Sequence, residues 1–266
     1  MIMWLLLFVL IVIISFLLAY QSMKDFPERG QEGLEHGLYL IRNPRNLTSG
    51  VLEQIHRTSL RDHFVISLER LFKGSKSALV IYGPKQVLGE FTQLSLLELE
   101  EYTDAAGDKA TSWEVGTKDQ MALHISVPRP WDNKPLLDEP EQFWWQIVLK
   151  PQVKGLLGKG EGITALLTAA RYRSLEASPE HKEILELKNK QKVFQAQIRA
   201  ALLIENPDKR KREAERWANI GAPSLIKIPK PLTSKQIMDL YRQRALPIGS
   251  KLTLTTEEIL LLFGVR

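Results

Sequence analysis

The sequence contains no cysteine, and this absence excludes disulfide bonds, thiolate catalysis and zinc sites built on thiolates. Its five histidines show neither the HxxxH nor the HExxH spacing of a helical metal site, and they stand at His36, His56, His63, His124 and His181. A strong charge of one sign is also missing, because 36 Lys and Arg residues oppose 31 Asp and Glu residues. The net charge of +5 is too small to indicate a nucleic-acid-binding protein by itself. We therefore predict neither a metal nor a cofactor.

A nucleotide-binding motif is absent as well. The glycine-rich stretch from Gly155 to Gly162 has two residues between its first glycine and the Gly-Lys pair, and Gly160 follows Lys159. A P-loop needs four residues there, and then Ser or Thr. We interpret the stretch as a surface loop, with anion contact at the start of the next helix as the alternative. The acidic pair Glu98 and Glu100 lies on one strand face without a histidine or serine partner, so the sequence predicts no enzyme.

A long apolar segment opens the chain. Residues 2–19 are apolar except for Ser15, whose hydroxyl can bond to a backbone carbonyl one helical turn earlier. These 18 residues span about 27 Å as a helix, close to the roughly 30 Å of bilayer hydrocarbon. Trp4 and Tyr20 stand near the two ends, where aromatic rings favour the headgroup level. We predict a single-pass transmembrane helix in the lipid bilayer.

The flanks of this segment favour an anchor over a cleaved signal peptide. No Lys or Arg precedes it, and no small-x-small cleavage site follows it at Ala19-Tyr20-Gln21. The nearest basic residues, Lys24 and Arg29, lie on its C-terminal side. By the positive-inside rule, we expect the globular part on the cytoplasmic side of the plasma membrane.

The remainder of the chain alternates between strand and helix patterns, so the predicted fold class is α+β. We expect an anchor with its flank at 1–23, a juxtamembrane linker at 24–47, a first α+β subdomain with a polar loop at 48–117, a second at 118–232 and a C-terminal helical segment at 233–266. Strands are expected at 63–72, 78–82, 96–102, 121–127, 143–149, 193–204 and 225–228. Helices are expected near 51–60, 84–94, 162–175 and 207–220, and after Thr233 and Thr255, which have capping-box spacing. The architecture we expect is one or two ferredoxin-like sandwiches, with two as the favoured number.

Two groups of apolar residues are candidates for a protein interface. Trp144 and Trp145 are neighbours on a predicted strand, so their rings point to opposite faces, one into the core and the other against a helix or a partner. The last helix carries Ile259, Leu262 and Phe263 in an almost wholly apolar run. This run is either docked on another chain or packed into the domain's own core.

A basic run is the candidate anion site. Lys209, Arg210, Lys211 and Arg212 follow one another in a predicted helix, where they could meet phosphates of nucleic acid or lipid. Helical spacing spreads them over more than one face, and the glutamates that follow dilute the charge. A solvated helix surface is therefore the alternative, and nucleic acid has weak support.

The second half of the chain carries a set of motif residues in a fixed order. The first strand supplies Trp145, Gln146, Ile147, Val148 and Pro151, and the second region supplies Glu186, Lys188, Phe194, Ile198 and Arg199. A charged helix follows, and the chain closes on an L-T-x-E-E-I-x-x-L-F pattern. From 142 to 263 this order resembles the region preceding the motor in membrane-anchored conjugative coupling ATPases of type IV secretion, the TraG/TraD-like proteins.

The resemblance implies a function in binding. In that family the nucleotide-binding core would begin where this chain stops at Arg266, so no Walker or arginine-finger residue carries over. The implied function is a membrane-anchored, non-enzymatic accessory or scaffold that recruits a separately encoded ATPase or forms a homo-oligomer. The alternative is an unrelated membrane-tethered enzyme or ligand-binding domain. A neighbouring reading frame for a motor without its own membrane domain would favour the first hypothesis.

Overall fold

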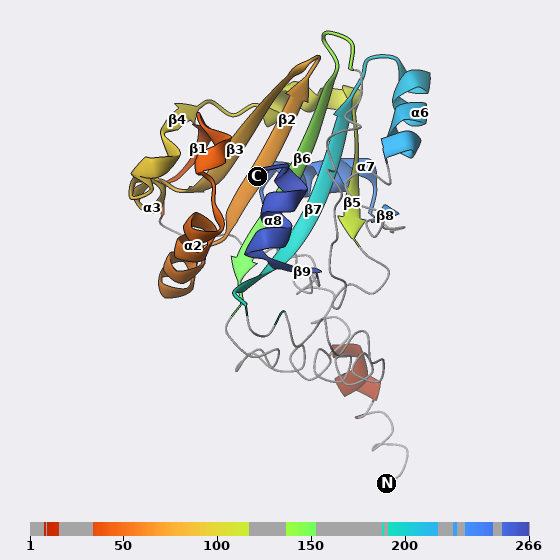
Figure 1. Cartoon of the computed structure of the whole chain (residues 1–266). Coiled ribbons are helices and arrows are strands. Elements are labelled where there is room, and N and C mark those ends of the chain that lie inside the picture. The colour runs from red at the N-terminus through yellow and green to blue at the C-terminus, as the bar shows by residue number, and fades with distance from the viewer. Residues whose placement is uncertain are drawn as a thin grey trace.

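The computed structural model describes residues 8, 10–15, 34–116, 137–152, 188, 191–217, 226–227, 232–246 and 252–265. These residues form an α+β fold around one antiparallel sheet (Figure 1). Nine strands belong to this sheet within the described ranges, and eight of them follow the order β4-β1-β3-β2-β6-β7-β5-β8. The ninth, β9, pairs with β7.

The first half of the sheet has the element order β-α-β-β-α-β. Its elements are β1 (His36–Ile41), α2 (Ser49–Asp62), β2 (Ile66–Lys73), β3 (Lys76–Pro84), α3 (Lys85–Gly89) and β4 (Leu96–Leu99), with short 3-10 turns at Pro44–Asn46 and Thr92–Leu94. The Thr48 side chain caps α2 by accepting from the Val51 N–H. Gly74 has a φ of 53° in the tight turn between β2 and β3, a conformation that glycine adopts without strain.

The second half continues the same sheet. Its elements are η3 (Thr103–Lys109), β5 (Ala110–Gly116), β6 (Gln142–Pro151), β7 (Val193–Leu203), α6 (Pro207–Trp217), β8 (Ile226–Lys227), α7 (Ser234–Arg242), β9 (Leu252–Thr255) and α8 (Thr256–Phe263). Strand β6 pairs with β2 from Ile66 opposite Leu149 to Lys73 opposite Gln142, which joins the two halves. Strand β7 pairs with β6 on one edge, and on the other edge with β5 and β9 at different positions.

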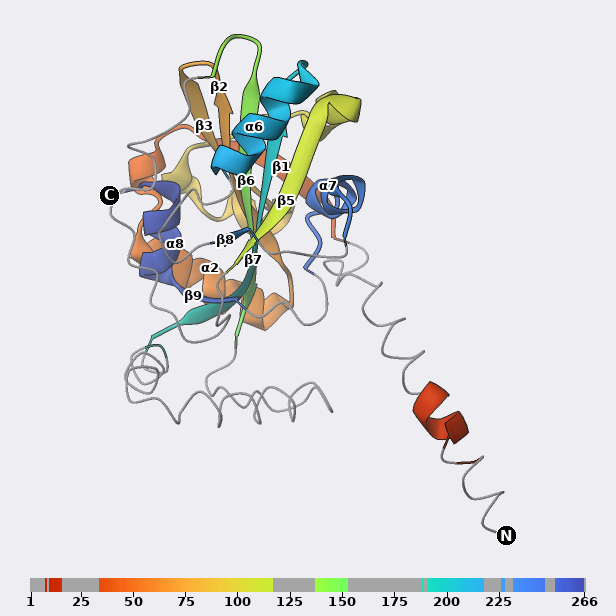
Figure 2. The same cartoon turned by 90° about the vertical axis from the view of Figure 1, so that its right-hand side faces the viewer.

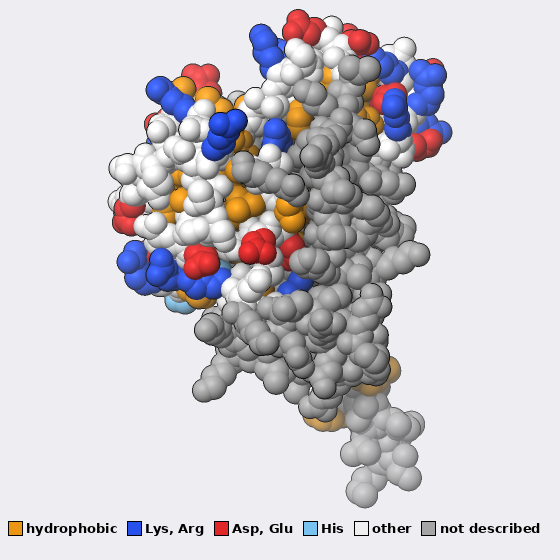
Figure 3. All heavy atoms as spheres, viewed as in Figure 1, with side chains coloured by type: hydrophobic (Ala, Val, Ile, Leu, Met, Phe, Trp, Pro, Cys, Tyr) orange, Lys and Arg blue, Asp and Glu red, His pale blue; other side chains and the backbone are white. Residues whose placement is uncertain are grey.

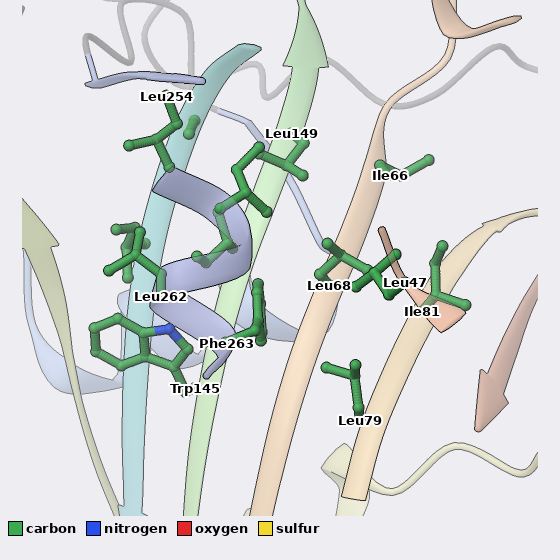
Figure 4. Close-up of a cluster of buried hydrophobic side chains, with 14 of the residues drawn as sticks. Leu47, Ile66, Leu68, Leu79, Ile81, Trp145, Leu149, Leu254, Leu262 and Phe263 are labelled. Carbon is green, nitrogen blue, oxygen red and sulfur yellow. The ribbon is translucent and has the colours of Figure 1, made fainter. Parts of the chain in front are cut away.

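Helices cover both faces of the sheet. Figure 2 shows α2 and α8 on one face and α7 on the opposite face. On the α8 face, Trp145 and Leu149 of β6 join Leu262 and Phe263 of α8 in the main hydrophobic core (Figure 4). On the α7 face, Trp144 belongs to a smaller, separate cluster that includes α7 residues. The prediction that the two tryptophan rings point to opposite faces is confirmed.

The boundaries expected from the sequence differ from the structure in several places. Strand β9 lies inside the predicted C-terminal helical segment, and the predicted helix at 84–94 is α3 followed by a separate 3-10 turn. Strand β1 lies inside the predicted 24–47 linker. Gly37 favoured a linker in the sequence, but in the strand its missing side chain leaves room for the Tyr39 ring against the backbone. Strand β5 lies in the predicted polar loop, because its Ser112 and Glu114 are polar although buried. Since β5 pairs with β7 and β2 pairs with β6, the predicted division at 117/118 does not separate two sheets.

Other expectations are confirmed or lie outside the described residues. The helices after Thr233 and Thr255 are present, and both have complete capping boxes. The predicted strand at 121–127, the helix at 162–175 and the glycine-rich loop lie outside the described residues, as do Trp4, Tyr20 and most of the predicted anchor. Among the residues that the structure describes, no helix is both long and apolar enough to cross a membrane.

Candidate functional site

A row of polar side chains crosses the middle of the sheet on the face that α7 covers. In the strand register, Glu69 of β2 lies opposite Gln146 of β6, Gln146 lies opposite Arg199 of β7, and Arg199 lies opposite Glu114 of β5. Residues opposite one another on adjacent strands share a face. Each of the four is at most 2% exposed. We call these four residues the polar row.

Amide side chains connect the charges of the polar row. Gln146 Nε2 donates to Glu69 Oε1 at 2.9 Å, and Arg199 Nη1 donates to Gln146 Oε1 at 3.0 Å. Arg199 Nη2 donates to Gln197 Oε1 at 2.8 Å, and Gln197 Nε2 in turn donates to Glu114 Oε1. The two amides therefore carry a chain of hydrogen bonds from one carboxylate through the guanidinium to the other carboxylate.

The polar row also binds the C-terminal end of α7. Arg199 donates to the carbonyl oxygen of Leu240 at 3.1 Å and to that of Ala245. Gln146 Nε2 donates to the Tyr241 carbonyl oxygen at 3.0 Å. The Leu240 and Tyr241 carbonyl oxygens also accept the backbone N–H groups of Ala245 and Arg244, so the polar row adds a second donor to carbonyls that carry partial negative charge. Arg199 Nε has no hydrogen-bond partner among the described residues.

A third segment meets this network at Glu69. The chain between β4 and β5 supplies Tyr102, whose hydroxyl donates to Glu69 Oε2 at 2.6 Å and lies 2.9 Å from the Tyr241 hydroxyl. Beyond α7, Arg244 Nε donates to Glu69 Oε1 at 3.0 Å, and its Nη1 donates to Glu101 Oε2 at 2.7 Å. One carboxylate therefore links the sheet, the segment after β4 and the end of α7.

Arg244 is held in a strained backbone conformation. Its φ of 49° lies in the left-handed region, which costs a non-glycine residue roughly 1–2 kcal/mol. Its guanidinium lies over the Tyr82 ring at 4.4 Å from the centroid, in addition to its two carboxylate partners. The contacts of the side chain offset the backbone strain, and they fix the turn that ends α7.

Burial shapes the electrostatics of the network. Burial lowers the pKa of Arg199 to about 10, so its guanidinium stays charged at neutral pH. Burial acts in the same direction on Arg244, but the carboxylates of Glu69 and Glu101 outweigh it, and the pKa of Arg244 is raised. Burial, together with nearby Glu69, raises the pKa of Tyr102 and Tyr241 well above the ordinary value. Both hydroxyls therefore remain protonated at neutral pH.

A second buried pair holds α8 on the other face. Lys188 Nζ lies 3.2 Å from Glu258 Oε1 and donates to the Thr253 carbonyl oxygen at 2.7 Å. Glu258 also closes the capping box of α8 by accepting from the Thr255 N–H at 2.8 Å. At the other end of α8, Arg70 Nη1 donates to the carbonyl oxygen of Phe263. Each of the two helices thus has its C-terminal carbonyls bound by an arginine of the sheet.

Several residues that carry the resemblance lie in these two sets. Gln146 and Arg199 are 53 positions apart in the sequence and directly hydrogen-bonded. Lys188 pairs with Glu258 of the closing pattern. Trp145, Ile147, Phe194 and Ile198 lie in the main core. Glu186 lies outside the described residues.

The candidate interface residues are core residues in this structure. Trp144, Trp145, Ile259, Leu262 and Phe263 are each at most 1% exposed. The reason is that β9 pairs with β7 and leads α8 back over the sheet, while α7 covers Trp144. In this structure the last helix packs into the chain's own core, which is one of the two alternatives given for it, and both tryptophan rings are buried within the fold.

The basic run in α6 is only partly available to an anion. Lys209 pairs with Asp138 at 2.7 Å and Glu141 at 2.6 Å, and Arg210 donates to the Ile204 carbonyl oxygen at 2.9 Å. Lys211 and Arg212 are exposed. Figure 3 shows acidic and basic side chains mixed at the position that α6 occupies in Figure 1. Two of the four predicted contacts thus serve the fold.

Sequence reasoning missed two of the four residues of the polar row, Glu69 and Glu114. It named Arg199 and Gln146 only through the resemblance, and it gave no role to Glu69, Tyr241 or Arg244. The available signal was the charge of Glu69 and Arg199 within strands that are otherwise largely buried. A buried charge needs a partner, but the sequence does not show which strand supplies it.

Within the described ranges, no group of three His, Cys, Asp or Glu side chains is placed to hold a metal ion. Comparison with protein-family models found no match, and comparison with curated proteins found none either.

Proposed function

We propose that this chain is a membrane-anchored, non-enzymatic accessory or scaffold module of a type IV secretion-like machine. Its part is to recruit a separately encoded ATPase, or another protein partner, to the plasma membrane from the cytoplasmic side. Confinement to a surface raises the effective concentration of a recruited partner without any catalysis by the anchor protein.

The N-terminal helical residues carry the proposal. Phe8 and residues 10–15 are helical, and the apolar side chains from Leu10 to Ile14 are 46% to 54% exposed. Five consecutive helical residues point in all directions around the axis, so this stretch is apolar on every side. An apolar helix of this kind is stable in a bilayer or under a protein cover, and not in water. The anchor proposed for residues 2–19, with Ser15 within it, rests on this exposure and on the apolar sequence.

The contacts between motif residues support the likeness to the TraG/TraD-like region. The residues of this degenerate pattern contact one another in the fold, as residues with a shared structural role would. Gln146 with Arg199 and Lys188 with Glu258 are such contacts, and they hold helices on the two faces of the sheet.

The finer fold assignment is part of the same proposal. The first half has the β-α-β-β-α-β element order, and its strands lie in the order β4-β1-β3-β2 with all neighbours antiparallel. That arrangement supports a ferredoxin-like first half built from two split β-α-β units. The second half extends its sheet at the β2 edge.

The anchor is tested by extraction. We expect full-length protein to stay with the membrane pellet at alkaline pH, and a Val12→Lys/Ile13→Asp variant to enter the supernatant. Each charge in the middle of a membrane helix costs about 2.5–3.5 kcal/mol. A Gln54→Lys variant, altered on the exposed face of α2, is the control and should stay in the pellet. Protease added to intact cells should spare the domain, and degradation from outside would reverse the proposed orientation.

Recruitment is tested with a TraG/TraD-like motor ATPase that lacks its own membrane domain. We expect that ATPase in the membrane fraction when full-length protein is co-expressed, and in the soluble fraction when residues 1–23 are deleted, because the deletion removes the surface confinement. Fractionation and immunoblotting measure the shift. If the ATPase divides between the membrane and soluble fractions in the same way with the full-length chain and with the deletion, the recruitment function is ruled out.

A further inference from the structure

A buried histidine joins helix α2 to the ends of two central strands. His56 of α2 is 4% exposed, and its Nε2 donates to the carbonyl oxygen of Val193, the first residue of β7, at 2.9 Å. The same carbonyl oxygen accepts the backbone N–H of Gln152, which directly follows β6. The ring also lies edge-on to that of Phe194, with 4.9 Å between the ring centroids. His56 therefore contacts the sheet where β6 ends and β7 begins.

The hydrogen bond to Val193 assigns the protons of the ring. A carbonyl oxygen only accepts, so Nε2 of His56 carries a hydrogen, and in the neutral ring Nδ1 carries none. Nδ1 has no hydrogen-bond partner among the described residues. The same holds for two other buried polar atoms, Oγ of Ser59, one turn along α2, and Oε1 of Gln152. A proton added at Nδ1 would therefore place a buried positive charge without a new hydrogen bond to hold it.

Burial has the largest influence on the protonation of this ring. It lowers the pKa of His56, and the backbone groups of Val193 and Gln152 raise it by less. Two charged side chains act in opposite directions, since Lys192 lowers the pKa and Glu53, one turn earlier on α2, raises it. These two side chains pair with each other at 3.2 Å. The folded chain therefore keeps the ring neutral at a pH where an exposed histidine is partly charged.

We propose that His56 is an acid-sensitive contact, which loosens α2 from the ends of β6 and β7 when its ring takes up a proton. At the start of α2, Ser49 Oγ lies 2.8 Å from Thr256 Oγ1 of α8, and neither hydroxyl titrates in this range. Apolar side chains of α2 lie in the main core, and their contacts do not respond to pH; they are Val51, Leu52 and Ile55. The acid response therefore belongs to the second half of α2. It does not depend on the membrane anchor or on recruitment.

Denaturation of full-length protein in detergent measures the effect of the proton on stability. The unfolded chain binds a proton at position 56 near the ordinary histidine pKa of about 6.5, and the folded chain binds it only at lower pH. Stability is therefore full above that pKa and falls as pH drops below it. Between about pH 7.5 and about pH 5.5, we expect the folded-to-unfolded ratio to fall at least about 3-fold more in the wild type than in a His56→Gln variant. The glutamine amide can still donate to the Val193 carbonyl oxygen, but it does not titrate.

A second histidine supplies the matched control. His63 is the exposed C-cap of α2, and its φ of 55° is a left-handed conformation that asparagine tolerates. A His63→Asn variant should keep the wild-type dependence of stability on pH. If the His56→Gln variant keeps it as well, the acid response does not come from His56 and the proposal is overturned.

The absence of cysteine permits a local probe of α2. A Ser59→Cys variant places a thiol on the buried side of α2, and an Ala200→Cys variant places one within β7, both at positions that are at most 1% exposed. Labelling by an acid-tolerant pyridyl disulfide, relative to the denatured protein at the same pH, measures how often each position opens. We expect position 59 to be labelled faster than position 200 at about pH 5.5, and its labelling to rise at least about 3-fold from about pH 7.5. Addition of His56→Gln should remove the rise. Equal labelling at both positions would overturn a local contact, because α2 would then open only with the whole domain.

A direct reading of the proton uses the wild-type protein. NMR of full-length protein with labelled histidine in detergent follows the ring of His56 as the pH is lowered. We expect the midpoint of its titration to lie below the ordinary value of about 6.5. A midpoint at or above that value would overturn the proposal, because proton uptake would then not destabilise the folded chain.

Discussion

A Phe263→Ala variant is expected to lose about 3–5 kcal/mol of unfolding free energy, the usual cost of removing a fully buried aromatic ring. The ring is 0% exposed and lies in the main core with Trp145 and Leu149 (Figure 4). Denaturation of full-length protein in detergent, followed by tryptophan fluorescence, measures the loss. In the part of the chain that the structure describes, four buried tryptophans report on the two hydrophobic clusters, at Trp113, Trp144, Trp145 and Trp217.

The control for this variant lies on the same helix. Leu260 is only partly buried, and its replacement by alanine should cost clearly less, about 1 kcal/mol. If the two variants lost equal stability, α8 would not be a core helix, and its apolar side chains would again be candidates for contact with another chain. The same reasoning predicts that deletion of residues 255–266 unfolds the domain instead of only removing an interface.

Local signals in the sequence predicted the elements well. Capping-box spacing after Thr233 and Thr255 marked both terminal helices, and the alternation of Phe194, Ala196 and Ile198 marked β7. The glycine-containing turn at Gly74 marked the hairpin of β2 and β3. These signals succeed because caps, turns and alternation depend on residues close together in the chain.

Long-range pairing was not predictable in the same way. Strand β5 looks like a loop because Ser112 and Glu114 are polar, and only the contacts of the folded chain satisfy them. The polar row depends on the register of four strands that are separated by up to 130 positions, from Glu69 to Arg199. Local patterns in one sequence do not show which distant strands pair or in which register, so the polar row could not be predicted from them.

The two arginines that bind helix ends follow one physical rule. Arg70 and Arg199 each lie within a strand, on opposite faces of the sheet, and each donates to the last carbonyls of the helix above it. Positive charge placed at a helix C-terminus stabilises the helix, and more strongly where the charged group is partly buried. A positively charged residue inside a buried strand can therefore hold a helix in place by donating to carbonyl oxygens at its C-terminus. This structural role is an alternative to a catalytic one.

The second large effect is expected at Glu258. A Glu258→Gln variant keeps the shape of the side chain and can still close the capping box, as Gln236 does at the start of α7. It removes the charge that faces Lys188, and it leaves a buried cation without its carboxylate. Loss of one partner of a buried ion pair typically costs about 3–5 kcal/mol. We expect a loss of that size in the unfolding free energy.

A neighbouring residue supplies the control, and pH supplies a second test. Glu257 is exposed on the same helical turn, so Glu257→Gln should cost at most about 1 kcal/mol. Burial already lowers the pKa of Lys188, and Glu258 opposes that shift, so the variant lowers it further. Below this lowered pKa the buried cation carries its full cost. Above it Lys188 folds neutral while the unfolded chain still binds the proton, so the deficit of Glu258→Gln should shrink as pH rises toward the ordinary lysine value. A deficit that stays constant with pH would mean that the lost charge pair is not its cause.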